Sequence, residues 1–167
     1  MPLSAQEREG YIERYARGAG LLRAAWEAVP PAARQWRPGA GKWSPHEIVC
    51  HCADSEANAA LRIRYLLAEK EPVIVGYDQD VWAASLDYHA HPADVALATV
   101  EAVRGHTTPL LRRLPQEAWS KQGRHTESGR YGAEDWLRIY AEHLENHSAQ
   151  IERTLAAWRA AQAAGRG

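Results

Sequence analysis

The chain has 167 residues, of which 46% are hydrophobic and 25% charged, and its formal net charge is −1. This length and composition are typical of a globular domain, and we expect residues 1–167 to form a single one. Because 20 basic and 21 acidic residues are mixed along the chain, the charge pattern argues against a nucleic-acid partner. No apolar stretch is long enough to span a bilayer and the N-terminal segment lacks the pattern of a signal peptide, so we expect no membrane partner.

The first two predicted helices begin at matching capping signals. Ser4 precedes Glu7 by three residues, which is the spacing of a capping box, and this helix is expected to end near residue 29, before Pro30. The segment Ser44-Pro45-His46-Glu47 repeats the signal, with proline at the first helical position. The second helix is expected to continue to about Glu69.

The chain has two cysteines, Cys50 and Cys52, within this second helix. Side chains two residues apart on a helix point in different directions, so the two thiols cannot easily form a disulfide. Free thiols indicate a reducing compartment, and we expect the protein in the cytoplasm. The favoured interpretation of the pair is two small buried hydrophobic side chains.

The rest of the chain predicts two more long helices and little sheet. A short helix is expected around residues 78–85, a long one at about residues 91–114 that Pro109 should kink or shorten, and another at about residues 133–163. The run Pro72-Val73-Ile74-Val75-Gly76 is the only strand-like piece and is isolated, and residues 115–132 are expected to be a long connection. Four long helices with two long connections predict an all-α four-helix bundle in which connections can cross over.

Two histidines lie four residues apart on the apolar stripe of the last helix. Four residues turn a helix by about 400°, so His143 and His147 project from one face and can chelate a transition metal together. His51 lies on the inward face of the second helix, and bundles commonly build metal sites between facing helices. We therefore predict a three-histidine metal site. Spacing alone leaves two alternatives open: core histidines bonded to carbonyl groups, or another of the eight histidines as the third ligand.

Three segments resemble the DinB/YfiT-like superfamily. Residues 41–56 contain Lys-Trp-Ser before the helix and His51 followed by Asp-Ser-Glu, as in the family's opening signature. Residues 140–151 contain Tyr, then His143 and His147, then Gln-Ile, as in its closing motif. Residues 77–83 are similar to a Tyr-Gln-Trp-Ala stretch of the YfiT-like branch. The similarity extends over about residues 11–158.

The resemblance implies a four-helix bundle with long crossover connections and, by motif position, a metal held by His51, His143 and His147. It implies one divalent transition metal, with Zn or Ni expected, and possible use of a low-molecular-weight thiol cosubstrate such as bacillithiol or mycothiol. Many family members are homodimers, which we expect here too. The expected function is a metal-dependent thiol S-transferase or hydrolase acting on a small electrophilic molecule. The alternative is a non-catalytic metal-binding protein of the stress response.

Several side chains are expected to support the metal site. Asp54 and Ser55 follow His51 by three and four residues, so either could accept a hydrogen bond from its imidazole or lie at the edge of the pocket. No side chain is assigned as the nucleophile, which is expected to be a water or thiol activated by the metal. Glu142 and Glu145 lie off the apolar stripe and are expected to be solvated.

Substrate contacts are expected from two segments outside the long helices. The candidates on a loop over the metal are Tyr77, Asp80 and Trp82. The candidate on the connection before the last helix is His125. Each could instead be an ordinary packed or solvated residue. Arg62 and Arg64 could bind an anionic substrate or be solvated.

Overall fold

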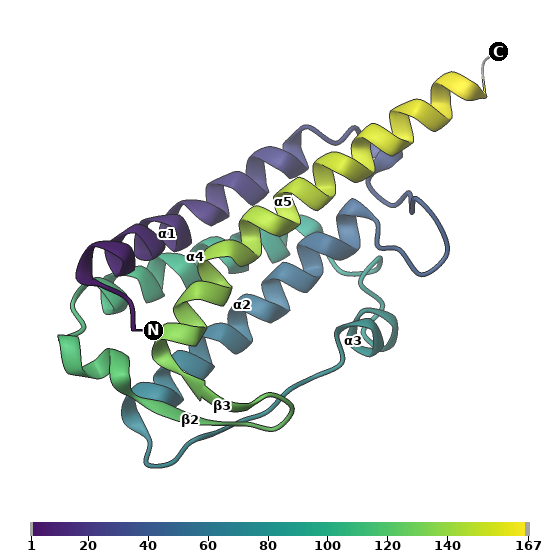
Figure 1. The fold of residues 1–167 in the computed structure, drawn as a ribbon. Coiled ribbons are helices and arrows are strands. Elements are labelled where there is room, and N and C mark those ends of the chain that lie inside the picture. The colour runs from purple at the N-terminus through teal and green to yellow at the C-terminus, as the bar shows by residue number, and fades with distance from the viewer. Residues whose placement is uncertain (1, 166–167) are drawn as a thin grey trace.

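The computed structural model describes residues 2–165, and four long helices dominate it (Figure 1). They are α1 (Ala5–Glu27), α2 (Pro45–Ala68), α4 (Ala93–Arg112) and α5 (Ala133–Ala164). The short helix α3 (Gln79–Ser85) precedes α4, and two 3-10 turns occupy Pro31–Ala33 and Gln116–Ser120. The predicted helices are confirmed, and Pro109 lies inside α4 without ending it. None of the helices in the described part of the chain is both long and apolar enough to cross a bilayer.

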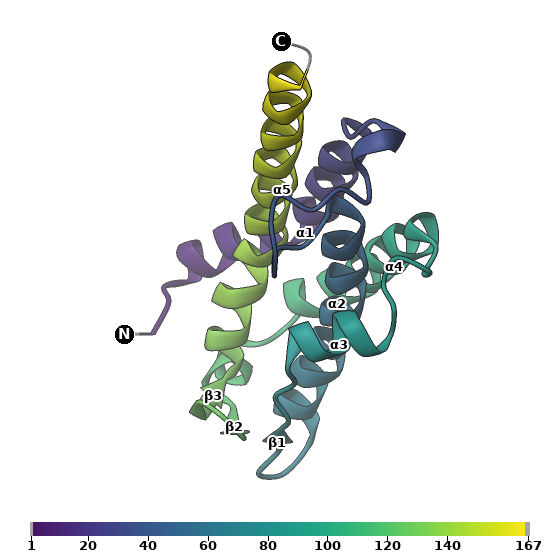
Figure 2. The ribbon, with the colours of Figure 1, turned by 90° about the vertical axis from the view of Figure 1, so that its right-hand side faces the viewer.

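The order of the helices around the bundle differs from their order along the chain. α1 packs against α4 and α5, and α2 packs against the same two helices. α1 and α2 therefore lie diagonally opposite each other, as do α4 and α5 (Figure 2). The α1–α2 and α4–α5 connections both cross the bundle, which confirms the predicted crossover topology. This order makes α2 and α5 neighbours, so residues of the two helices can share a site.

Local signals in the sequence set where the helices begin. Ser4 Oγ accepts a hydrogen bond from the Glu7 amide at 3.2 Å, and the Glu7 carboxylate accepts one from the Ser4 amide at 2.8 Å. Ser44 and Glu47 form the same reciprocal pair at 3.2 and 2.9 Å. Both predicted capping boxes are confirmed, and they satisfy amide groups that the first turn leaves free.

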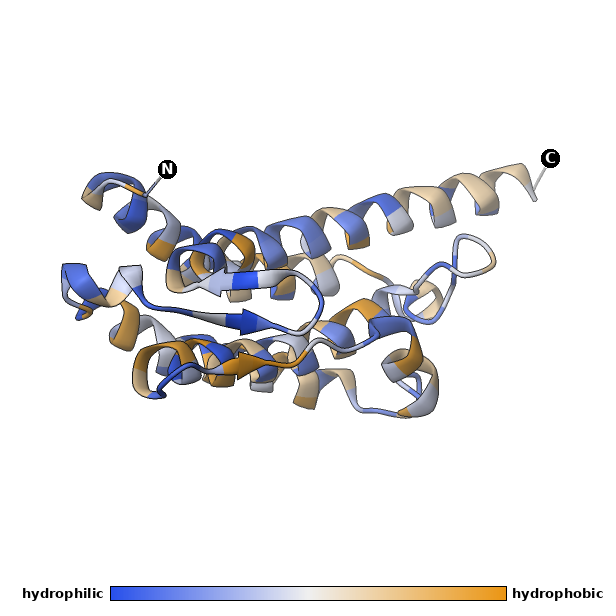
Figure 3. Ribbon diagram, turned by 60° about the horizontal axis from the view of Figure 1, so that its bottom comes forward, coloured by the Kyte–Doolittle hydropathy of each residue, from blue (hydrophilic) through white to orange (hydrophobic). Residues whose placement is uncertain are grey.

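The prediction that the only strand-like piece lies at residues 72–76, with residues 115–132 a long connection, was wrong. That segment contains β2 (Gln122–His125) and β3 (Gly129–Gly132), which pair as an antiparallel hairpin. β1 (Val73–Ile74) pairs in parallel with β2 and is therefore not isolated. Figure 3 shows why the hairpin gave no sequence signal: β2 and β3 are largely hydrophilic and lack an apolar alternation, whereas β1 is hydrophobic. A Cβ at Gly123 would lie 2.3 Å from the Pro72 carbonyl oxygen, so glycine permits this close approach.

Buried aromatic side chains join the helices around the core. Trp136 of α5 packs against Tyr15 of α1 with ring centroids 5.3 Å apart. Its Nε1 donates a hydrogen bond to the Ala59 carbonyl of α2 at 2.9 Å. Because the indole N–H finds a partner inside the core, the Trp136 ring can be fully buried without leaving a polar atom unsatisfied.

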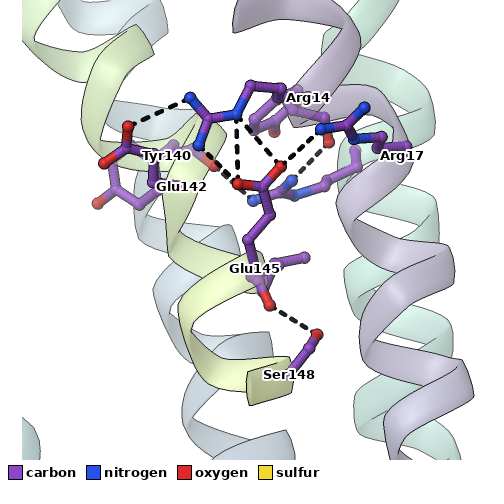
Figure 4. A network of polar contacts seen from close by, with 9 residues as sticks. Arg14, Arg17, Tyr140, Glu142, Glu145 and Ser148 are labelled. Carbon is purple, nitrogen blue, oxygen red and sulfur yellow. Dashed lines mark hydrogen bonds and ion pairs between the residues drawn. The ribbon is translucent and has the colours of Figure 1, made fainter. Parts of the chain in front are cut away.

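Ion pairs hold the outer side of α5 against α1 (Figure 4). Arg14 contacts Glu145 at 2.6 Å and Glu142 at 3.2 Å, and Arg17 contacts Glu145 at 3.1 Å. The prediction that both glutamates are solvated was wrong for Glu145, whose side chain is 23% exposed. Glu145 lies two residues from His143, about 200° around the helix. Glu145 therefore lies on the opposite side of α5 from His143, and its ion pairs to α1 hold the helix in the rotation that turns His143 toward α2.

Candidate metal centre

Three histidine rings meet between α2 and α5. The ring centroid of His51 lies 5.5 Å from that of His143 and 4.8 Å from that of His147, and the last two are 4.5 Å apart. One nitrogen of each ring can be chosen so that all three lie within 4.8 Å of one another. Within residues 2–165, no other group of three or more His, Cys, Asp or Glu side chains is so placed.

The ring nitrogens of this cluster lack the partners that core histidines usually have. His51 is 2% exposed, and neither of its ring nitrogens has a hydrogen-bond partner. Nδ1 of His143 is likewise buried and unpartnered. His147 Nδ1 lies 2.9 Å from Gln150 Oε1, which leaves Nε2 of that ring for another ligand. A buried polar atom without a partner costs about 1–3 kcal/mol, and a shared cation would remove that cost.

The environment keeps these imidazoles neutral. Burial and, to a lesser extent, the neighbouring His147 together lower the pKa of His51 to about 3. Burial, followed by the other two rings, lowers the pKa of His143 well below its ordinary value. Burial also lowers the pKa of His147. Three neutral imidazoles with free lone pairs are a donor set that fits a divalent transition metal.

A buried ion pair lies directly behind His143, and the sequence analysis missed it. Glu56 is 0% exposed and Arg104 is 1% exposed, and Arg104 Nη2 donates to Glu56 Oε1 at 2.6 Å. The same carboxylate oxygen lies 3.8 Å from His143 Nδ1. Burial raises the pKa of Glu56, and the guanidinium of Arg104 opposes that effect. A Cβ on Gly18 would lie 2.3 Å from Arg104 Nη1, so glycine makes room for the arginine.

A signal for this pair was present in the sequence. Glu56 lies on the same helical stripe as Cys52, Ala59 and Ile63, all of which are buried. A carboxylate on a buried stripe requires a partner, because an unpaired buried charge is strongly unfavourable. The stripe therefore predicts a buried cation, although it does not say which helix supplies it.

The two predicted partners of His51 contact other groups instead. Ser55 Oγ lies 3.4 Å from Nε2 of His143, on the facing helix. Asp54 Oδ2 accepts a hydrogen bond from the Tyr88 hydroxyl at 2.6 Å. The expectation that either residue accepts a hydrogen bond from His51 was therefore wrong. Each side chain bonds to the element that packs against its side of α2, which is α5 for Ser55 and the segment around Tyr88 for Asp54.

The predicted substrate contacts divide into two groups. Tyr77 and Trp82 stack with ring centroids 4.3 Å apart, and the Tyr77 hydroxyl shares a hydrogen bond with Ser55, next to His143. Asp80 is exposed and lines a cavity of about 350 Å³. Trp43, which the sequence analysis missed, lines the same cavity and lies 4.8 Å from the His51 ring.

His125 belongs to the β2–β3 hairpin, and the contacts of its ring lie within that hairpin. Its Nδ1 accepts hydrogen bonds from the amides of Glu127 and Ser128 at 3.2 and 3.4 Å. Its ring lies 5.6 Å from that of Tyr131. The structure therefore brings Tyr77 close to His143 through Ser55 and stacks Trp82 on Tyr77. Asp80 shares a cavity with Trp43, which packs on the His51 ring, whereas the ring of His125 contacts the hairpin alone.

The two cysteines are buried, free thiols. Cys50 Sγ lies 3.5 Å from the Tyr88 carbonyl oxygen, and burial raises the pKa of Cys50 to about 12. Burial also raises the pKa of Cys52 well above its ordinary value. Neither thiol is a reactive thiolate at neutral pH, which fits their interpretation as small buried hydrophobic residues.

Proteins of known sequence and structure resemble this chain. A protein from Oceanobacillus iheyensis named "Putative metal-dependent hydrolase" is 34% identical over 111 residues, which are 66% of this chain and 64% of that protein. One of the same name from Bacillus cereus is 32% identical over the same shares. The similarity thus spans slightly less than two thirds of the length of these relatives.

Two solved structures share the fold. YfiT from Bacillus subtilis, described as "a probable metal-dependent hydrolase with an unusual four-helix bundle topology", superposes with a TM-score of 0.85 and 25% identity. The match covers 92% of this chain and 88% of YfiT. A mycothiol-dependent maleylpyruvate isomerase superposes with a TM-score of 0.69 over 86% of this chain and 60% of the isomerase. At 12% identity, that likeness concerns the fold alone. The sequence model of the DinB superfamily matches residues 14–151, and this chain belongs to that superfamily.

Proposed function

We propose that this protein binds one divalent transition metal through His51, His143 and His147 and uses it in a reaction on a small electrophilic molecule. The observation that carries the proposal is the set of neutral imidazoles, with one nitrogen from each ring within 4.8 Å of the others and no hydrogen-bond partner at either nitrogen of the buried His51. The names of the relatives, which refer to metal-dependent hydrolases, support it. A bound ion supplies Lewis acidity, which lowers the pKa of a water or thiol that it binds.

Side chains around the cluster are placed to orient the ligand rings. Glu56 faces the Nδ1 side of His143 at 3.8 Å, so its negative charge favours the tautomer with a proton on Nδ1. The lone pair that would hold the metal is then on Nε2, whose neighbour in the chain is Ser55 Oγ at 3.4 Å. Gln150 contacts Nδ1 of His147 and leaves Nε2 of that ring free in the same way. Trp43 packs on the His51 ring and limits its access to water.

The more specific part of the proposal is the identity of the nucleophile and of the metal ion. A thiol S-transferase and a hydrolase would use the same metal centre and differ in whether a low-molecular-weight thiol or water attacks the substrate. Zn and Ni both suit three imidazole ligands, and we propose one of them. Tyr77 and Trp82 would form an aromatic wall for the substrate. Substrate contacts from Asp80 and His125, a homodimer and a cytoplasmic location stay predictions.

The first experiment measures metal content. Wild-type protein, His147→Ala and the control His106→Ala, which removes an exposed histidine of α4, are purified in parallel and analysed for transition metals. We expect close to one Zn or Ni per chain in the wild type and in His106→Ala, and almost none in His147→Ala. A wild-type protein that carries no metal and fails to bind added Zn²⁺ would overturn the proposal.

The second experiment measures turnover. The metal-loaded protein is incubated with a panel of small electrophiles, with and without a low-molecular-weight thiol, before and after treatment with a chelator. Turnover that requires both metal and thiol indicates a transferase, and turnover with metal and water alone indicates a hydrolase. If the loaded protein turns over none of the panel, the non-catalytic metal-binding alternative is favoured.

A further inference from the structure

A line of polar residues continues along α2 from the histidine cluster. His51, Ser55, Asn58 and Arg62 follow one another at steps of four, three and four residues, which places them on one face of the helix. Asn58 bonds within α2, since its Nδ2 donates to the Asp54 carbonyl at 2.9 Å. Arg62 ends this line and is half-buried. The segment around Tyr77 lies over it, because the centre of the guanidinium is 5.7 Å from the Tyr77 ring.

Two short chains of contacts connect Arg62 to a proposed metal ligand. Arg62 Nη1 donates to the Tyr140 hydroxyl at 3.0 Å, and the Tyr140 ring lies 5.8 Å from the His143 ring. The guanidinium also lies over Tyr77, whose hydroxyl shares a hydrogen bond with Ser55, and Ser55 Oγ is 3.4 Å from His143 Nε2. Arg62 is therefore separated from His143 by a single tyrosine on one side and by Tyr77 and Ser55 on the other.

The positive charge of Arg62 has no counter-ion. Its two bonded partners are neutral, namely the Tyr140 hydroxyl and the Val75 carbonyl at 2.7 Å, and no carboxylate of the described residues is within ion-pair distance. Asp54 is bonded to Tyr88 instead. Nη1 and Nη2 each donate one of these bonds, so three of the five guanidinium N–H groups remain for another acceptor. A half-buried arginine with free donors favours an anion, above all a carboxylate, which matches its planar geometry.

We propose that Arg62 binds an anionic group of the substrate, so that this site selects small molecules that carry a carboxylate. The inference rests on the proposed function, since it assumes that the reacting part of the substrate meets the metal. A divalent ion held by three neutral imidazoles adds positive charge and favours an anion further. Arg62 lies seven residues after Ser55, roughly 10 Å along the helix axis. The selected molecule is therefore expected to separate its carboxylate from its reacting atom by several bonds.

The experiment compares matched thiols on the cobalt-substituted protein. The probes are ω-mercapto acids with chains of three to six carbons and the corresponding ω-mercapto amides, which have the same shape without the charge. Thiolate binding to Co²⁺ is followed by its near-ultraviolet charge-transfer band. At the chain length that fits best, the acid should bind about tenfold more tightly than its amide, because only the acid gains a charge-assisted bond to Arg62.

Variants of two neighbouring arginines separate charge recognition from a structural role. In Arg62→Gln the preference for acid over amide should fall to about one, whereas both thiols should still bind. Arg64→Gln is the matched control, because Arg64 points to the other side of α2, where it contacts the Ala60 carbonyl and Thr107, and it should keep the wild-type preference. A residue that only held the fold would weaken acid and amide alike.

The outcomes distinguish the two proposals. If the cobalt protein binds acid and amide equally at every chain length, or if Arg62→Gln keeps the wild-type preference, the anion inference fails while the metal site stands. If the protein retains Co²⁺ but binds neither the acid nor the amide thiols, the anion inference fails and the thiol-transferase assignment fails with it, whereas the metal site and the hydrolase assignment stand.

Discussion

Histidines gather at two places along α2, and only one of them has the properties of a metal site. Near the start of the helix, the ring centroids of His46 and His89 are 5.7 Å apart. Further along, those of His51 and His143 are 5.5 Å apart, almost the same distance. Proximity of imidazoles therefore does not distinguish the two places.

The hydrogen-bond partners of the rings do distinguish them. His46 Nε2 lies 2.7 Å from the His91 carbonyl oxygen, and His89 Nε2 lies 2.8 Å from Ser44 Oγ. Both ring nitrogens of the buried His51, in contrast, have no partner. Histidines whose nitrogens are already bonded stabilise the packing of a loop against α2, whereas unpartnered buried nitrogens indicate a ligand that the protein chain does not supply.

The largest expected difference between the two places is metal-linked stability. Zn²⁺ at about 1,000 times its dissociation constant should stabilise the wild type by about 4 kcal/mol, which for a chain of this length raises the melting temperature by about 10 °C. His51→Ala should lose this response, and His89→Ala should keep it. Thermal unfolding followed by circular dichroism with and without Zn²⁺ measures both. An equal loss of response in the two variants would contradict the distinction.

The next largest expected difference is in the free energy of unfolding when the carboxylate beside each histidine cluster, Glu56 or Glu47, is neutralised. Glu56→Gln leaves Arg104 buried without its counter-ion and should lower the free energy of unfolding by about 3 kcal/mol. Glu47→Gln at the other cluster should cost about 1 kcal/mol or less, because its partner Arg37 is half exposed and keeps its hydration. Urea unfolding of the metal-free proteins gives both values. Equal losses would show that burial of the pair does not set its contribution.

Glu56→Gln should also weaken metal binding, by about 10- to 100-fold, because the charge that favours the Nδ1 tautomer of His143 is lost. If the single variant fails to fold, the double variant Glu56→Gln/Arg104→Met removes the unpaired cation and restores a measurable protein. Unchanged metal affinity in a folded variant would show that Glu56 has no influence on the ligand ring.

The sequence predicted the helices because their signals are local. Capping boxes at Ser4 and Ser44 and the apolar stripe of α5 are each read within a few residues. The β2–β3 hairpin was missed because its strands are short and polar and β1 joins them from a distant segment. Its close packing depends on Gly123 beside Pro72, a tertiary contact that periodicity does not reveal.

The three histidines were predicted from spacing and from family resemblance, and the structure brings their rings together. Their surroundings were harder to predict, since partners of a side chain on α2 come from elements that are distant in sequence. Helix periodicity alone predicted that Asp54 and Ser55 contact His51, but in the structure Asp54 bonds to Tyr88 and Ser55 contacts His143. Helix periodicity gives the face of a residue but not which neighbouring element covers that face.

The smallest expected difference is in the pH dependence of the metal-free protein. Burial lowers the pKa of His51 to about 3 in the folded chain, whereas the unfolded chain has the ordinary value of about 6.5. Between these values the unfolded state binds the extra proton, so the stability present above about pH 6.5 is lost as the pH falls, by at most about 1.4 kcal/mol per pH unit for one histidine. Burial also lowers the pKa of His89, but the charge of Glu47 opposes it. His51→Ala should therefore flatten the pH dependence more than His89→Ala does. Urea midpoints of the chelator-treated proteins at pH 7, 6 and 5 test this. A wild-type midpoint that stays constant over that range would mean that the histidines take up protons in the folded state as they do in the unfolded chain.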